Sequence, residues 1–506
     1  MIDLIVDAPI VADVCNDDLG NLAKFLDSRR KNNFRNWVYV GQKLEVFELL
    51  LDRSEPKQVE QPKPIDSKKL IVFDQLFFWL AAIAEDGGTL HELDPDTMAL
   101  VKAASRLGGE TRILTSNKIR LEIGLPFING QDVMKSIATE TSIPLIDLKM
   151  QQDQIRPNLE RSIHVVLHHG QYVNGPEISK LEGVLADFVG VKHCVSVSSG
   201  TDALLISLLS LGIGRGDEVV TTAFSFIGTA EAILLAGATP VFVDVDVRTG
   251  NMDVYQLDSR ITHRTRAILP VSLYGQTANM TKIKEIAGIR RLPVIEDGAQ
   301  SFGAHHNHVR SCGGTTIGCT SFFPAKSLGA YGDAGACFTD DSNLAEAMRE
   351  ILNHGQKERY EHVRVGLNGR MDSLQAAVLL AKLEVFDQEL ESRKRIANHY
   401  SESMSHLEKE NRLKLPFIEH GNCSAWTQYT IQVTDRDHIK NALAELGVPT
   451  AIHYPKSLPD QIALSEFHGV FPNSEELAKN VLSLPMHPYL RETEQKRIIE
   501  KISSVL

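Results

Sequence analysis

Short apolar runs alternate with helical stretches over the middle of the chain, from about residue 146 to residue 385. The runs are rich in β-branched residues and bounded by turns, as in CVSVSSG, DEVVTTAF, TPVFVDVD and RAILPVSLYG. Apolar strands separated by helices are typical of βαβ units. The pattern therefore predicts a large α/β domain with a mainly parallel sheet over 146–385.

The pattern changes near residue 386. A long charged helical segment, LEVFDQELESRKRIANHYSESMSHL, is followed by a strand-like run, AWTQYTIQV, and by further helical residues. This order predicts a smaller α+β domain over 386–506.

Residues 1–140 mix strand-like and helix-like runs around a charged, proline-containing segment at 53–69, which predicts a separate small α/β domain with an exposed loop. The order of its acids, Asp7, Asp94 and Asp96, resembles that of PIN-like nuclease domains. Asn117 stands where such domains carry an acid, and a metal-dependent nuclease needs several carboxylates. We therefore expect a degenerate PIN-like or unrelated interaction domain rather than a nuclease.

Composition narrows the class of protein. The 506 residues are 43% hydrophobic and 23% charged, as in ordinary globular proteins, and the net charge of −12 makes a nucleic-acid partner unlikely. No apolar run approaches the roughly 20 residues of a membrane helix, and MIDLIVDAPIVADV lacks the basic start of a signal peptide. The six cysteines form no CxxC pair and indicate free thiols. We expect a cytoplasmic protein that does not bind membranes.

The segment SFFPAKSLGAYGDAGACFTDD, residues 321–341, contains one lysine, Lys326, with no acid within four positions on either side. An apolar setting lowers the pKa of a lysine and makes its amine a nucleophile toward carbonyl groups. The alternative is a surface lysine with its stem along apolar neighbours.

Two further motifs suit a cofactor that carries a phosphate. In SSGTDALLISLL, Gly200 and Thr201 stand where a strand gives way to a helix, and a helix N-terminus attracts anions; the alternative is ordinary capping by Ser199. In VIEDGAQSFGA, Asp297 and Gln300 follow an apolar strand, where open parallel sheets bind ligands. A phosphate cradle, an acid and a lysine, in this order along the chain, match an enzyme that uses pyridoxal 5′-phosphate (PLP).

Residues from about 146 to the C-terminus resemble the DegT-type nucleotide-sugar aminotransferases, PLP enzymes of the aspartate-aminotransferase fold (fold type I). The resemblance rests on collinear motifs: QYVNGPEISKLEGVLADFVG, SSGTDAL, GDEVVTTAFSF, VDVDVRTGNMD, EDGAQSFGA, TSFFPAKSLGAYGDAGA and VGLNGRMDSLQAA. Within the family, VLHHGQYVNGPE, TSFFPAK, GVPTAIHYP and LSLPMHPYL are most similar to enzymes that aminate C3 of UDP-2-acetamido-2-deoxy-3-oxo-glucuronate.

The resemblance implies a role for each matched position. It assigns the cofactor to Gly200, Thr201, Phe226, Asp297, Gln300, Ser321, Lys326 and Asn368, and the substrate to Arg370, His453 and Tyr454. Lys326 would hold PLP as a Schiff base and act as general base. Asp297 would pair with the pyridine nitrogen, Gln300 would hydrogen-bond the phenolic oxygen, and Phe226 would stack on the ring.

The resemblance also implies partners. Gly200, Thr201 and Ser321 would hold the phosphate, and Asn368 would reach it from a second subunit, so we expect a homodimer with shared active sites. L-Glutamate would donate the amino group to a UDP-keto-sugar acid, for the synthesis of a surface polysaccharide such as O-antigen or lipopolysaccharide. Arg370 suits a uronate carboxylate because its guanidinium binds two oxygens at once.

Other readings are open at this stage. The chain could aminate C4 or a deoxysugar, or could be a non-catalytic regulator on the same scaffold. A sugar dehydratase of this family would carry histidine in place of Lys326. The segment AHHNHVRSCGG, with His305, His306, His308 and Cys312, fits no zinc-finger spacing, so we expect no metal.

Overall fold

The computed structural model describes residues 113–114, 120–121 and 143–506. The chain divides into two compact units, 1–141 and 142–506. In the first unit, β1 (Ile113–Leu114) pairs antiparallel with β2 (Arg120–Leu121). The rest of the expected PIN-like domain lies outside the described residues, so its fold stays a prediction.

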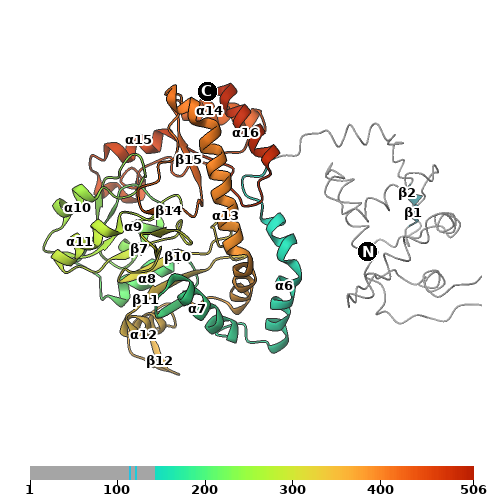
Figure 1. The fold of residues 1–506 in the computed structure, drawn as a ribbon. Helices are drawn as coiled ribbons and strands as arrows, with labels where there is room; N and C mark the ends of the chain where they lie inside the picture. The colour runs from blue at the N-terminus through green and yellow to red at the C-terminus, as the bar shows by residue number, and fades with distance from the viewer. Residues whose placement is uncertain (1–112, 115–119, 122–142) are drawn as a thin grey trace, which may run out of the picture. The chain divides into compact units, whose positions relative to one another are not determined.

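A seven-stranded sheet forms the centre of the second unit (Figure 1). Its strands are β3 (His193–Val197), β4 (Glu218–Thr222), β5 (Thr239–Val243), β6 (Thr265–Leu269), β7 (Ile295–Asp297), β10 (Ile317–Ser321) and β11 (Gly335–Thr339). The order is β3-β11-β10-β7 and β6-β4-β5, and the parallel bridges Ile268–Val294 and Val271–Asp297 join the two parts. Only β11 runs antiparallel to its neighbours. The predicted mainly parallel sheet is confirmed.

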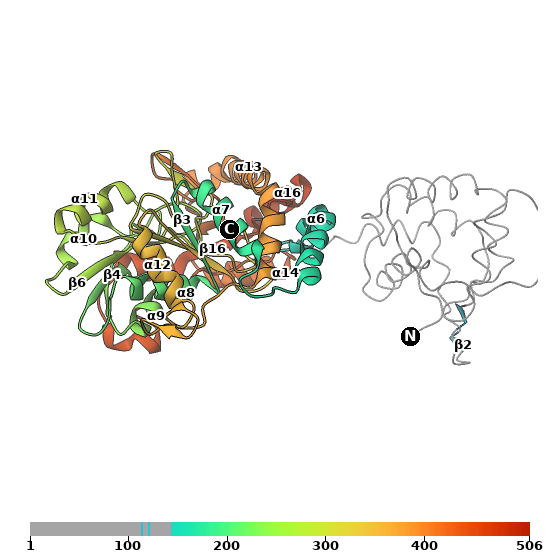
Figure 2. The ribbon, with the colours of Figure 1, turned by 90° about the horizontal axis from the view of Figure 1, so that it is seen from below.

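Helices cover both faces of this sheet (Figure 2). They are α7 (Pro176–Val189), α8 (Gly200–Ser210), α9 (Gly228–Leu235), α10 (Val254–Arg260), α11 (Met280–Arg290) and α12 (Ser342–Ile351). Alternate strand residues face opposite sides of a sheet. Val219 packs with residues of α8, α9 and α12, whereas its neighbour Val220 packs with residues of α10 and α11. Both faces are therefore buried, which explains the near-continuous apolar runs in the sequence.

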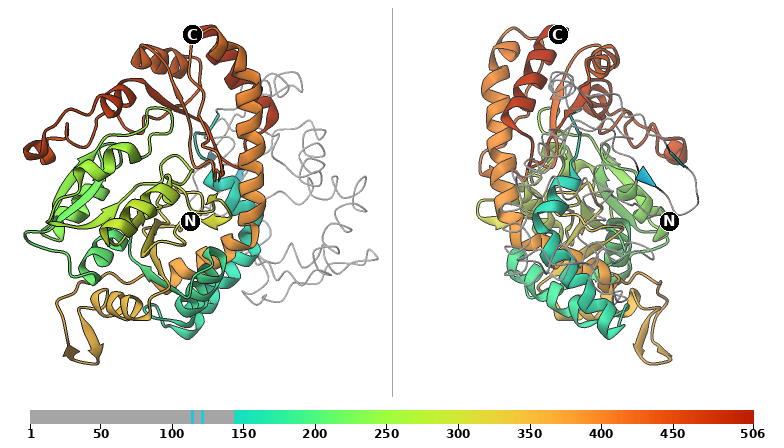
Figure 3. Two further views of the ribbon diagram at one scale, coloured as in Figure 1. Left: turned by 60° about the vertical axis from the view of Figure 1, so that its left-hand side comes forward. Right: turned by 90° about the vertical axis from the view of Figure 1, so that its right-hand side faces the viewer.

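One long helix, α13 (Ser373–Lys409), runs from the sheet domain to the C-terminal part of the chain (Figures 1 and 3). There it packs with the antiparallel strands β15 (Tyr429–Gln432) and β16 (Val481–Leu484). Three helices complete this part: α14 (Arg436–Glu445), α15 (Pro472–Asn480) and α16 (Glu492–Val505), with the short 3-10 helix η2 (Ile462–Phe467). The expected charged helix is present, although it begins at Ser373, before the predicted domain limit at 385/386. That limit stays a prediction.

The remaining elements lie around these two parts. They are α6 (Leu148–His169), β8 (His305–His306), β9 (Val309–Arg310), β12 (Gln356–Glu358), β13 (Glu361–His362) and β14 (Asn422–Cys423). The β12–β13 hairpin projects from the body of the unit (Figure 3). Among the described residues, no helix is long and apolar enough to cross a membrane.

Candidate active site

The carboxyl ends of three parallel strands bring the candidate residues to one edge of the sheet. Asp297 is the last residue of β7 and Ser321 the last of β10, and these strands are parallel. Strand β3 has the same direction, because both β3 and β10 are antiparallel to β11. The turn from β3 into α8 therefore lies at the same edge, where open α/β sheets bind ligands.

The N-terminus of α8 faces Ser321 closely enough to need a glycine. A Cβ built on Gly200 would lie 2.6 Å from Cβ of Ser321. Ser199 caps the helix by accepting a hydrogen bond from the Asp202 amide at 3.0 Å, so the capping alternative also holds. The first-turn amides and the helix dipole favour an anion at this point. Gly200 and Thr201, at the start of α8, are thus brought next to Ser321, and we call these three residues the cradle.

Asp297 is buried beside this cradle, with an exposed fraction of 5%. Its Oδ2 accepts a hydrogen bond from Thr229 Oγ1 at 2.8 Å, and its Oδ1 accepts one from the Ala299 amide at 3.2 Å. Burial raises the pKa of Asp297, while these two donors and the charge of Lys326 act in the opposite direction. No sequence motif pointed to Thr229, which lies on α9 and reaches Asp297 only through the fold.

Lys326 is half-buried in the turn after β10. Burial lowers the pKa of its ammonium group, and the charge of Asp297 partly offsets that effect. No acceptor within the described part of the chain lies at hydrogen-bonding distance from its Nζ. The charge interaction places the amine near Asp297, and burial shifts its protonation equilibrium toward the neutral, nucleophilic form.

Gln300 connects the sheet edge to the C-terminal part. Its Nε2 donates to the hydroxyl of Tyr454 at 2.8 Å, and its Oε1 accepts from the Tyr274 amide at 3.0 Å. The Tyr274 hydroxyl donates to the carbonyl of His453. These bonds place the AIHYP segment against the edge that carries Asp297 and Lys326.

His453 and Phe226 lie at the same edge of the sheet, near Lys326 and Tyr454 respectively. The imidazole Nδ1 of His453 is 2.9 Å from Ser483 Oγ on β16. Burial, with a smaller effect from the Lys326 charge, lowers the pKa of His453 to about 4. Phe226 is 55% exposed, and its ring centroid is 6.0 Å from that of Tyr454. An exposed aromatic ring next to Tyr454 is thus available for stacking.

Arg370 and Asn368 lie on the loop that precedes α13. Arg370 forms a bridge with Val197 of β3, and its Nη1 donates to Asn353 Oδ1 at 2.6 Å. Arg370 is half-buried, whereas Asn368 is exposed. The loop is therefore anchored beside the end of β3, while Asn368 is open to solvent in the single chain.

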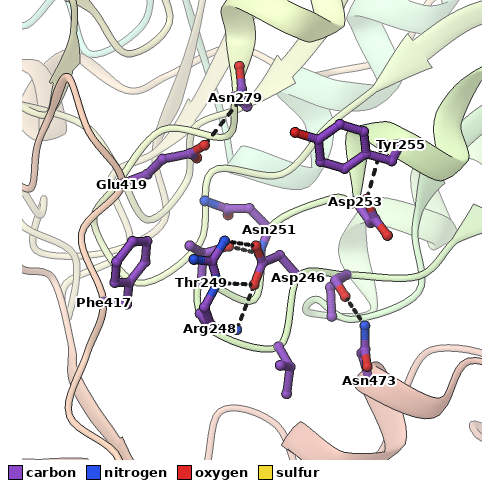
Figure 4. A network of polar contacts seen from close by, with 12 residues as sticks. Asp246, Arg248, Thr249, Asn251, Asp253, Tyr255, Asn279, Phe417, Glu419 and Asn473 are labelled. Carbon is purple, nitrogen blue, oxygen red and sulfur yellow. Dashed lines mark hydrogen bonds and ion pairs between the residues drawn. The ribbon is translucent and has the colours of Figure 1, made fainter.

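A polar network fixes the loop after β5 next to this region (Figure 4). Arg248 forms a two-pronged ion pair with Asp246, at 3.1 and 2.7 Å, and its guanidinium lies 4.6 Å from the ring centroid of Phe417. Asn279 donates to Glu419 at 3.1 Å. This network, which no sequence motif indicated, joins the sheet domain to the segment that leads into the C-terminal strands.

Two other features do not belong to the site. A hollow of about 780 Å³ lies at the amino ends of β4, β6 and β7, at the opposite edge of the sheet. Among the residues that line this hollow, Arg290 forms an ion pair with Asp258, and Arg266 forms one with Asp217. Within residues 143–506 and the two short strands, no group of three or more His, Cys, Asp or Glu is arranged to hold a metal ion.

Comparison with known proteins gives the family. Residues 153–503 match the model of the DegT/DnrJ/EryC1/StrS aminotransferase family. A UDP-2-acetamido-2-deoxy-3-oxo-D-glucuronate aminotransferase from Pseudomonas aeruginosa is 50% identical over 348 residues, 69% of this chain and 96% of the relative. A UDP-N-acetyl-3-dehydro-alpha-D-glucosamine 3-aminotransferase from Acidithiobacillus ferrooxidans is 40% identical, covering 72% and 98%.

A solved structure agrees with these sequence matches. The crystal structure of NtdA from Bacillus subtilis with bound cofactor PMP has a TM-score of 0.67 and 30% identity, covering 73% of this chain and 86% of that one. The fold type I architecture expected from the sequence is confirmed. The chain belongs to the DegT/DnrJ/EryC1/StrS family of PLP-dependent sugar aminotransferases.

Proposed function

We propose that the chain transfers the amino group of L-glutamate to the 3-keto carbon of a UDP-linked N-acetyl-hexuronic acid. The product would be UDP-2-acetamido-3-amino-2,3-dideoxy-glucuronate, made in the cytoplasm for surface polysaccharide. The observation that carries the proposal is the 50% identity to the P. aeruginosa aminotransferase over 96% of its length.

The residues at the sheet edge fit the three parts of PLP. The α8 N-terminus and Ser321 suit its phosphate, and Gly200 permits their close approach, since a Cβ there would lie 2.6 Å from Cβ of Ser321. Asp297 suits the ring nitrogen, and Phe226 presents an exposed ring for stacking. Burial lowers the pKa of Lys326, which favours its reaction with the aldehyde carbon. The fit supports the role that the family resemblance implies for each of these residues.

When bound, PLP supplies an aldehyde that carries the amino group and a ring that withdraws electrons. The chain's own residues do the rest. Lys326 Nζ would remove the proton from the α-carbon of glutamate and return a proton when the keto sugar reacts. Asp297, as a carboxylate, would hold the ring N–H. His453 is neutral above about pH 4, so it adds no positive charge beside Lys326.

Arg370 is the proposed partner of the sugar carboxylate. One guanidinium nitrogen is held by Asn353, and Nε and Nη2 have no acceptor in the described part of the chain. Two parallel N–H groups match the two oxygens of a carboxylate. This geometry favours a uronate over the neutral 3-keto sugar named for the A. ferrooxidans relative.

The test measures products and selectivity together. Incubation with glutamate and UDP-2-acetamido-2-deoxy-3-oxo-glucuronate should give the 3-amino sugar by mass spectrometry and NMR. Arg370→Ala should lower kcat/KM for this acid by roughly 100-fold, the effect of losing a bidentate charged pair, and change that for UDP-N-acetyl-3-dehydro-glucosamine much less. Equal losses on both sugars would contradict the role of Arg370, and amination of only the neutral sugar would replace the proposed substrate.

A further inference from the structure

Thr229 lies in the first turn of α9 with its hydroxyl directed at Asp297. The side chain is 1% exposed, and the Oγ1–Oδ2 distance is 2.8 Å. Its Oγ1 also lies 3.0 Å from Oγ of Ser225, which is 5% exposed. Three polar groups from two segments of the chain therefore form one buried line.

The direction of each hydrogen bond follows from chemistry. An ionised carboxylate only accepts hydrogen bonds, so Thr229 must donate its single hydroxyl hydrogen to Asp297. The Thr229 oxygen is then free to accept, and Ser225 donates to it. Both hydroxyl hydrogens point toward the carboxylate, and each bond strengthens the other in a buried setting.

Asp297 is held at both oxygens. Thr229 occupies one side of Oδ2, and the Ala299 amide occupies one side of Oδ1 at 3.2 Å. These two hydrogen bonds fix the plane of the carboxylate, because rotation of the carboxylate about its Cβ–Cγ bond would break at least one of them. The lone pairs left over are those that can receive a ring N–H.

We propose that Thr229 is a positioning residue for the cofactor, which keeps Asp297 ionised and turned toward the pyridine nitrogen. The inference rests on the role proposed above for Asp297. A hydrogen bond that stabilises the charged form opposes the effect of burial, which raises the pKa of this carboxyl. The alternative is that Thr229 only satisfies buried polar groups. In that case, removing its hydroxyl would weaken cofactor binding to the same extent whether or not the cofactor has a ring nitrogen.

The test compares PLP with 1-deaza-PLP, in which carbon replaces the ring nitrogen. Thr229→Val keeps the shape and removes the donor; Thr229→Ser restores it. Thr221→Val is the matched control, since Thr221 is also buried but donates to the Leu269 carbonyl at 2.8 Å. The apoprotein of each variant is titrated with both compounds by absorbance, and the two dissociation constants are compared.

Thr229→Val should weaken PLP binding by about tenfold, as expected for a hydrogen bond to a charged group, and change the binding of 1-deaza-PLP less than about twofold. Thr229→Ser and Thr221→Val should behave as the unmodified protein. An equal loss for both compounds overturns the proposal. If Thr229→Val does not fold, Ser225→Ala replaces it. That variant must weaken the binding of PLP more than the binding of 1-deaza-PLP, by a smaller factor than expected for Thr229→Val. An equal effect on both compounds would overturn the proposal in the same way.

The variant Asp297→Asn tests the role of Asp297 separately from the role of Thr229. It should abolish the preference for binding PLP over 1-deaza-PLP. If it keeps that preference, the proposed role of Asp297 fails. If Asp297→Asn loses the preference and Thr229→Val retains it, the role of Asp297 stands and only the inference about Thr229 fails.

Discussion

Lys326 shows how a single residue can be interpreted from its neighbours. The apolar and glycine-rich segment around it predicts a lowered pKa, and the structure agrees in direction, with burial as the main cause. The charge of Asp297 works against this effect. The site therefore balances two needs, an amine that is neutral often enough to react and an acid that stays ionised beside it.

The other residues of the site differ in how far their local sequence identifies them. Asp297 follows an apolar strand and could be predicted from that position. Thr229 and Ser483, in contrast, look like ordinary polar residues of a helix and a strand. Their contacts with Asp297 and His453 join segments far apart in sequence, which neither periodicity nor spacing encodes.

His487 carries a prediction about pH. It is 2% exposed, and neither ring nitrogen has a hydrogen-bond partner in the described part of the chain. Burial is the main cause that lowers its pKa to about 4. The negative charges of Asp147 and Glu494 oppose this shift, whereas the positive charge of Arg393 adds to it. The ordinary pKa of histidine, about 6.5, applies when the chain is unfolded. The unfolded chain thus binds the proton first, and stability falls as pH drops from about 6.5 to 4.

Replacing this histidine should reduce that pH dependence. One such group contributes at most about 1.4 kcal/mol of unfolding free energy per pH unit in this window. His487→Gln should flatten the slope between about pH 6.5 and 4 in urea titrations, whereas His438→Gln, at an exposed position on α14, should not. Identical slopes for both variants would show that His487 does not titrate as described.

At the scale of elements, the junction of β3 and α8 depends on a close approach. Gly200→Ala would place a Cβ 2.6 Å from that of Ser321, so either α8 or the end of β10 must move. Overpacking of this kind costs about 1–3 kcal/mol. Since the cradle lies at this contact, we expect the dissociation constant for PLP to rise at least about tenfold.

Gly183 provides the matched control for that prediction. It lies inside α7, and a Cβ there would meet nothing within 4 Å. Gly183→Ala should stabilise the protein by up to about 1 kcal/mol through helix propensity and leave PLP binding unchanged. Equal cofactor affinity for the Gly200 and Gly183 variants would rule out the proposed cradle.

The order of elements was more predictable than their pairing. Apolar runs and turns indicated the strands β3 to β7 and the helices between them, because each signal is local. The antiparallel direction of β11 was not foreseen, since strand direction depends on the path of the connecting segment. The start of α13 at Ser373 was also missed, because its first turns are apolar and lack the charged pattern of the later ones.

At the scale of the whole molecule, we predict a homodimer. Around the projecting hairpin, Tyr360 is 79% and Val365 is 93% exposed, and Asn368 lies exposed on the same segment. Exposed apolar side chains near a site often mark an interface. A second copy seated here would supply Asn368 to the phosphate of its partner's cofactor.

Mixing two inactive variants tests this arrangement. Lys326→Ala and Asn368→Asp should each be inactive, the second because it places a negative charge near a phosphate. If Asn368 acts across the interface, a refolded 1:1 mixture should recover about one quarter of the normal activity, because half of the dimers are hybrids with one intact site. No recovery would place Asn368 in its own chain's site, and light scattering of an active monomer would exclude the dimer.

The first 140 residues lie before the region that matches the family, which begins at residue 153. Their role therefore remains a prediction from sequence alone. Every residue assigned to the cofactor or the sugar lies in the second compact unit, 142–506. The transaminase account rests on that unit.

The most direct measurement is reduction of the full-length, PLP-loaded protein with borohydride, followed by proteolysis and mass spectrometry. The account predicts one modified site, a peptide in which Lys326 carries the mass of the reduced cofactor, and no such adduct in Lys326→Ala. Cofactor attached to a different lysine, or a fully active Lys326→Ala protein, would contradict the central assignment.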